Sequence, residues 1–151
     1  MYNELKNIKV PTTIMTNSAE NNGNIFGAVD YLNHKKDIIN TGVTIKEYEG
    51  GISYHGKSMT IDDDIAIVGS FNMDMRSAYI DTELMLVINS KDINKQLKAS
   101  MAEYEKKAAT VKNETEYSHI PEGMKMKELS DKKKNIKAWF GWAMNGLRFL
   151  F

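Results

Sequence analysis

The sequence predicts an α/β domain in which a mixed β-sheet is flanked by helices. The chain has 151 residues, enough for one domain with its own core and not clearly enough for two. Several segments alternate apolar and polar residues, as strands do, and others space their apolar residues as helices do. Strand-like and helix-like segments follow one another along the chain, which favours a sheet with helices packed against it.

The first third of the chain predicts a strand, a helix and a second strand. Residues 10–16 predict a short strand. Apolar residues between 26 and 39 suit one face of a helix, and Gly42 is placed to end it in the left-handed conformation. Residues 43–48 again alternate apolar with polar side chains and predict the next strand.

The middle of the chain predicts a β-hairpin, a further strand and a helix. Residues 52–62 and 65–72 predict the two hairpin strands, because a short polar turn separates them. Residues 82–88 predict another, mostly buried strand. Ser90 can cap a helix with apolar positions at Ile93, Leu97, Met101 and Tyr104.

Composition divides the chain into three parts. Residues 1–110 contain all of these elements and form the predicted folded domain. Residues 111–130 are polar, contain Pro121 and Gly123, and predict a linker. Residues 131–151 begin with a lysine cluster and continue with Trp, Phe, Leu and Met, which predicts a basic and aromatic C-terminal helix.

Charge and cysteine content disfavour several classes of function. Twenty basic and twenty acidic residues give no net charge, which argues against a nucleic-acid binder that relies on a broad basic face. Cysteine is absent, so disulfides, thiolate metal sites and cysteine nucleophiles are excluded. We expect no signal peptide, since residues 1–10 hold no apolar run, and no stretch has the length of a membrane-spanning segment.

Four chemically active side chains gather in the predicted hairpin. A two-residue turn at residues 63–64 would place Lys57 opposite Ser70 and His55 opposite Asn72. Side chains two apart on a strand, or directly opposite on its neighbour, share a face of the sheet. All four therefore cluster at the open end of the hairpin, whereas a slip of one residue would scatter them.

This cluster suits a phosphodiester substrate. Lys57 supplies a positive charge, and Ser70 and Asn72 supply neutral donors that stabilise the extra charge of a five-coordinate phosphorus. His55 is the one group there that can attack phosphorus or move a proton near neutral pH. Glu83 lies one strand further on, where its carboxylate could fix the tautomer of His55.

Other polar residues have simpler explanations. Three consecutive acids at residues 62–64 are more simply explained by turn formation than by a metal site. Arg76 could contact a substrate phosphate, or it could pair with Asp74 or Asp81, and the sequence leaves both alternatives open.

The hairpin carries the pattern H-x-K-x4-D-x6-G-S-x-N, which resembles the signature of the phospholipase D superfamily at every defined position. The run GSFNMDMRS followed by DTELMLVI resembles the second half of bacterial cardiolipin synthases and related phosphatidyltransferases. The resemblance covers roughly residues 8–105. It implies that residues 1–110 are a phospholipase D-like catalytic half-domain.

The resemblance also implies roles for the motif residues. The superfamily uses a phosphohistidine intermediate and needs no metal, so no cofactor is expected. His55 would be the nucleophile or the general acid, and Asp62 and Gly69 would be structural members of the motif. Phosphate binding would fall to Lys57, Ser70 and Asn72, and orientation of the imidazole to Glu83.

The superfamily mechanism needs two histidines, and this sequence has one motif. The second half-site would come from a homodimer partner or from a missing N-terminal half. His55 lies in the first third of the chain, which favours the missing half and a domain incomplete at its N-terminus.

Three functions remain open, and they differ in substrate and in activity. The first is phosphatidyl transfer or hydrolysis on phospholipids, with water, glycerol or phosphatidylglycerol as acceptor. The second is a single-motif homodimeric nuclease, and the third is an inactive truncated fragment. If residues 131–151 form an interfacial helix, with lysines toward anionic headgroups, the protein would lie at the surface of the cytoplasmic membrane. Packing of this helix against a domain is the alternative.

Overall fold

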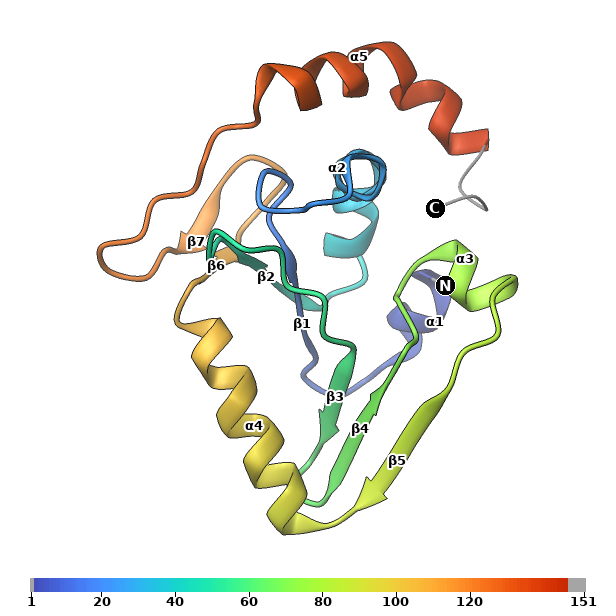
Figure 1. Ribbon diagram of the computed structural model, residues 1–151, viewed down its shortest axis with the longest axis vertical. Helices are drawn as coiled ribbons and strands as arrows, with labels where there is room; N and C mark the ends of the chain where they lie inside the picture. Colours follow the sequence, from blue (N-terminus) through green and yellow to red (C-terminus); the bar gives the residue numbers. More distant parts are fainter. Residues whose placement is uncertain (1, 147–151) are drawn as a thin grey trace.

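The computed structural model describes residues 2–146, apart from the side chains of residues 140 and 142–145. The predicted mixed sheet is present, and a second, antiparallel sheet accompanies it (Figure 1). The mixed sheet has the order β1-β2-β6-β7, with β1 parallel to β2 and the other pairs antiparallel. Its strands are β1 (Thr13–Asn17), β2 (Thr44–Tyr48), β6 (Ala108–Val111) and β7 (Tyr117–His119).

The antiparallel sheet carries Lys57, Gly69 and Ser70 at one end. It has the order β3-β4-β5, made of β3 (Ser58–Ile61), β4 (Ile65–Gly69) and β5 (Met85–Asn89). Helix α4 (Lys91–Glu105) contacts both β3 and β4, and it also contacts β2 and β6 of the mixed sheet. This helix therefore joins the two sheets (Figure 1).

Two of the longer helices, α2 (Ile25–Ile39) and α4, begin where the sequence supplies a capping side chain. Asn24 caps α2, and its side chain accepts from the N–H groups of residues 26 and 27. Ser90 caps α4 as predicted, accepting from the N–H of Ile93. Gly42 has a φ of 88° after α2, the left-handed conformation that its sequence position predicted. The structure also contains two short helices, α1 (Tyr2–Asn7) and α3 (Met75–Tyr79).

The core beside the mixed sheet consists of small and β-branched side chains. Ala28 and Val29 of α2 are fully buried, as is Ala109 of β6, and Ile45 of β2 is nearly so. The helix crosses from β1 to β2, which is the connection that two adjacent parallel strands require. This packing fixes the end of β1, where the Asn17 side chain contacts the segment that leads from β2 to the motif.

A buried ion pair crosses this core. The Nζ atom of Lys35 on α2 lies 2.8 Å from Oε1 of Glu47 on β2, and both side chains are almost fully buried. Tyr31 donates to the same carboxylate at 2.6 Å and Tyr117 at 2.5 Å. Burial, together with the neighbouring Glu47 charge, raises the pKa of both tyrosines, so they remain donors. Every charge in the group thus has a partner.

Part of the predicted linker is a strand, and Tyr117 begins it. Residues 117–119 of the predicted 111–130 linker form β7, which pairs with β6. Asn113 folds the intervening segment into a turn, because its side chain accepts from the N–H groups of Thr115 and Glu116. The polar composition of this segment reflects that turn rather than a free connection.

The hairpin register differs from the prediction by one residue. Ile61 pairs with Ile65, so the turn contains residues 62–64 instead of residues 63–64 alone. Asp62 adopts a φ of 47°, a conformation that Asp tolerates better than most residues. Lys98 of α4 donates to the carbonyl oxygen of Asp62 and, at 2.7 Å, to the carboxylate of Asp63. A helix that follows later in the chain thus stabilises the longer turn.

The predicted C-terminal helix is present as α5 (Asp131–Gly146), and residues 147–151 lie outside the described residues. It lies across α2 (Figure 1), where Asn33 donates to the carbonyl oxygen of Gly141 at 2.9 Å. Lys133 is buried and donates to three backbone carbonyl oxygens, those of Ala19, Glu20 and Asn22. None of the described helices has the length and apolar character needed to cross a membrane.

We expect Lys35→Met to destabilise the fold by about 3 kcal/mol, because it leaves the Glu47 carboxylate buried without its cation. Urea unfolding followed by circular dichroism would measure this loss. Lys36→Met is the matched control, since Lys36 is the exposed neighbour on the same helix and should cost under about 0.5 kcal/mol. Equal losses in the two variants would contradict a central role for the buried pair.

Candidate active site

His55 and Lys57 lie on the segment that enters β3, at the open end of the hairpin. The Nζ atom of Lys57 is 2.8 Å from Nδ1 and 3.2 Å from Nε2 of His55, and it donates to the His55 carbonyl oxygen at 2.9 Å. A neutral imidazole has one unprotonated ring nitrogen, which can accept from an ammonium group. An unprotonated ring nitrogen is also the atom that attacks an electrophile in nucleophilic catalysis.

Ser70 and Glu83 form the other side of this end. The hydroxyl of Ser70 donates to the carboxylate of Glu83 and accepts from the N–H of Leu84 at 3.0 Å. The hydrogen bond from Ser70 lowers the pKa of the Glu83 carboxyl, with smaller contributions from a hydrogen bond with Ser77 and the charge of Lys57. Glu83 is therefore ionised at neutral pH, and its charge acts on Lys57.

Gly69 is required for this arrangement because β5 approaches it closely. A Cβ atom at this position would lie 2.1 Å from the carbonyl oxygen of Leu84 and 2.4 Å from the sulfur of Met85. The N–H of Gly69 donates to the carbonyl oxygen of Lys57 at 3.1 Å, and the N–H of Ser70 donates to that of Leu84 at 3.0 Å. Gly69 thus links the segment of Lys57 to the segment of Ser70 and Glu83.

Two expected contacts are not formed. Asn72 follows Ser70 beyond the end of β4 with an exposed side chain, and among the described residues no hydrogen bond joins it to His55. Glu83 has Ser70 and Ser77 as its partners instead of His55. The expectation that Glu83 orients the imidazole directly is therefore replaced by a contact with the neighbouring serine.

The cluster forms for a reason other than the predicted one. With Ile61 opposite Ile65, a regular ladder would put Lys57 opposite Gly69 and would place Ser70 on the other face. The paired strands end at Ser58, Gly69 and Met85, however, so alternation does not apply to the site residues. The irregular ends of three strands bring the charges together.

Two other predicted residues lie away from this cluster. Asp62 occupies the hairpin turn, at the opposite end of β3 from Lys57, as expected for a structural residue. Arg76 pairs with Asp81, with Nε 2.9 Å from Oδ2, which decides between the alternatives left open by the sequence. Sequence reasoning missed Ser77, a buried residue in the middle of α3 whose only signal was its place in the MDMRS run.

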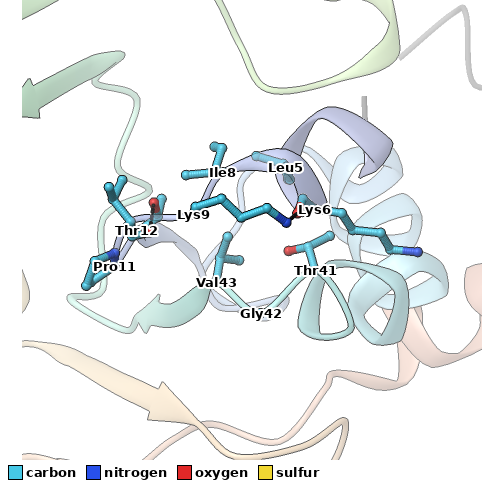
Figure 2. Close-up of a pocket in the computed structure, with 10 residues that line it drawn as sticks. Leu5, Lys6, Ile8, Lys9, Pro11, Thr12, Thr41, Gly42 and Val43 are labelled. Carbon is cyan, nitrogen blue, oxygen red and sulfur yellow. Dashed lines mark hydrogen bonds between the residues drawn. The ribbon is translucent and has the colours of Figure 1, made fainter.

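His55 and Ser70 are exposed, and neither of two hollows in the described part of the chain is lined by them. A hollow of about 470 Å³ lies between α1 and the loop before β2 and contains none of the motif residues (Figure 2). A second, of about 290 Å³, is lined by Phe71 and Met73, which flank Asn72, and by residues of α1 and α3. In the part of the chain that the structure describes, no group of three or more His, Cys, Asp or Glu side chains could hold a metal.

Comparison with known proteins agrees with this geometry. Residues 3–104, more than half of the chain, match the family described as "Cardiolipin synthase, PLD-like domain". The chain therefore belongs to this family of phospholipase D-like domains, as the resemblance of the hairpin motif implied.

Particular relatives are cardiolipin synthases A from bacteria. The protein from Wigglesworthia glossinidia brevipalpis is 35% identical over 68 residues, which are 45% of this chain and 14% of that protein. Those from Yersinia pseudotuberculosis serotype O:1b (strain IP 31758) and Yersinia pestis bv. Antiqua (strain Angola) are 33% identical over 78 residues, 52% of this chain and 16% of each protein. The chain thus spans only a small part of the length of these relatives.

We expect Gly69→Ala to destabilise the protein by about 1–3 kcal/mol, the usual cost of forcing an extra carbon into a packed position. The added methyl group would push Leu84 away and break its hydrogen bonds with Ser70. Chemical unfolding measures the loss, and Gly146→Ala is the control because, among the described residues, no atom lies within 4 Å of its added carbon. An unchanged free energy of unfolding in Gly69→Ala would show that the fold does not require the close approach of β5 to Gly69.

Proposed function

We propose that this chain supplies one of the two half-sites of a phospholipase D-type phosphodiester transfer that passes through a phosphohistidine. The observation that carries the proposal is the contact of His55 with Lys57 beside the Ser70–Glu83 pair. An imidazole, a cation and a hydroxyl donor are the groups that such a transfer requires.

The reaction proceeds in two displacements. In the first, one imidazole attacks phosphorus and the bond from phosphorus to the leaving oxygen breaks, while the second imidazole gives its proton to that oxygen. In the second, an acceptor alcohol or water attacks the phosphohistidine, the phosphorus–nitrogen bond breaks, and the acceptor's proton passes to the second imidazole. His55 takes one of these two roles, and the second half-site supplies the other.

The neighbouring residues act on the charge of the phosphate. Lys57 neutralises the non-bridging oxygens as the phosphorus becomes five-coordinate, and Asn72 donates to the same oxygens. Ser70 donates to them once its hydroxyl proton turns from the Glu83 carboxylate toward phosphate. Substrate binding would draw the Lys57 ammonium from the imidazole toward phosphate, which frees the ring nitrogen for attack. Before substrate binds, Glu83 accepts from the Ser70 hydroxyl, and Lys57 is held by its contacts with His55.

The apolar hollow beside Asn72 supports a phospholipid substrate over a nucleic acid. Its lining combines Leu5, Phe71, Met73, Ala78 and Tyr79 with a single charged side chain, that of Glu4. Acyl chains are favoured by such a surface, whereas polynucleotide backbones are recognised by clustered cations. The zero net charge of the chain points the same way. Phosphatidyl transfer is therefore proposed ahead of a single-motif nuclease or an inactive fragment.

We expect His55→Ala to abolish turnover of phosphatidylglycerol vesicles in an assembly that contains both half-sites, because no neighbouring group replaces the imidazole. Lys57→Ala and Asn72→Ala should each lower kcat/KM by about two to three orders of magnitude, the usual loss for one charge-stabilising contact. His119→Ala is the control, since His119 is exposed on β7.

Chelation gives the complementary test of this chemistry. EDTA should leave the rate unchanged, because the proposed displacements use side chains of the protein and no metal ion. Loss of activity in EDTA with recovery on adding a divalent cation would overturn the phosphohistidine mechanism.

The C-terminal helix is proposed as a peripheral contact with the membrane. Its packing against the domain uses Lys133 and Gly141, while the Trp139 side chain is 78% exposed on α5. Exposed Trp beside lysines is typical of helices that lie at the headgroup boundary. Packing and membrane contact were alternatives in the sequence analysis. They can both occur if they use different faces of one helix.

We expect Trp139→Gln to weaken co-sedimentation of the chain with vesicles rich in anionic lipid, because the indole is the large apolar group that α5 exposes among its described side chains. Val10→Gln removes another exposed apolar side chain, outside α5, and serves as the control. Equal binding by both variants and by the unchanged chain would leave α5 as a packing element only.

A further inference from the structure

The segment between β2 and β3 carries His55, and two asparagine side chains hold its backbone. Asn17, at the end of β1, donates from Nδ2 to the carbonyl oxygen of Tyr54 at 2.8 Å. The N–H of Tyr54 donates to Oδ1 of the same side chain at 2.7 Å. One amide group therefore satisfies both backbone groups of the residue that precedes His55, as a neighbouring strand would.

Asn21 extends this contact to the start of the segment. Its Nδ2 atom donates to Oδ1 of Asn17 at 3.1 Å and to the carbonyl oxygen of Ile52 at 3.2 Å. The N–H of Gly51 donates to Oδ1 of Asn21 at 2.9 Å. Asn17 and Asn21 are both buried, so water does not compete strongly for these bonds.

We infer that Asn17 is a positioning residue for His55, an inference that rests on the proposed function in taking His55 as the reacting group. The carbonyl that Asn17 holds belongs to the peptide unit joining Tyr54 to His55, so its orientation sets where the imidazole begins. β2 ends at Tyr48 and β3 begins at Ser58, so no strand ladder fixes this peptide.

The amide group is specific for this task. It presents a donor and an acceptor together, whereas a carboxylate presents acceptors only and a methyl group neither. The Tyr54 ring is anchored separately, 4.6 Å from the ring of Tyr104 and 6.2 Å from that of Tyr48. Loss of the amide should therefore loosen the backbone at Tyr54 and His55 while the ring and the fold stay in place.

The test compares Asn17→Ala and Asn17→Asp with Asn33→Ala. The control also removes an asparagine side chain that donates to a backbone carbonyl, that of Gly141, outside the His55 segment. We expect the Tyr54 amide of the full chain to exchange with solvent roughly tenfold faster in Asn17→Ala only. The ring cross-peak of His55 in the NMR spectrum should shift or broaden in both Asn17 variants and stay unchanged in Asn33→Ala.

Kinetics of the assembly with both half-sites then separate positioning from stability. The Asn17 variants should lose about a hundredfold in kcat with KM nearly unchanged, the effect of a small displacement of a reacting group. An unchanged His55 cross-peak overturns the inference. An unchanged kcat in a variant whose Tyr54 amide exchanges faster with solvent overturns it as well. Should Asn17→Ala fail to fold, Asn17→Asp decides by the His55 cross-peak and by kcat. Inactivity of the unsubstituted assembly would refute the proposed function, and the cross-peak alone would then decide the positioning role.

Discussion

The close approach of Leu84 to Gly69 is the contact on which the rest of the site depends. Absence of a side chain at Gly69 lets the Leu84 backbone exchange hydrogen bonds with Ser70. That pairing brings Glu83 to the Ser70 hydroxyl and places its carboxylate where it acts on Lys57. Without it, the ends of β4 and β5 would separate and the charged groups would share no surface.

The elements of the fold follow from local sequence, whereas the register of the hairpin does not. Capping by Ser90, the left-handed Gly42 and the alternating strands were all predicted from nearby residues. The turn at residues 62–64 was predicted one residue too short, because Lys98 stabilises the longer turn from α4. Such a contact spans 36 positions of the chain, and local patterns contain no signal for it.

The same limit applies to the candidate site. The motif gave the identities of its members, because their spacing is itself the signal, but it gave the wrong partner for Glu83. Strand alternation predicted one shared face, and the structure gathers the residues at irregular strand ends instead. Asn17 and Asn21 bind backbone groups of residues 51–54, which lie about thirty positions or more further along the chain. The polar sequence around the two asparagines therefore gave no indication of these partners.

A phosphodiester transfer through a phosphohistidine needs a second imidazole to protonate the leaving oxygen, and this chain carries one motif histidine. The most direct test is the rate of phosphatidylglycerol turnover by the 151-residue chain across a range of concentrations, with its mass followed by light scattering. The half-site account predicts negligible turnover by the monomer and activity only when a dimer forms or a second half-site is added. Turnover that stays proportional to concentration, by a species shown to be monomeric, would contradict it.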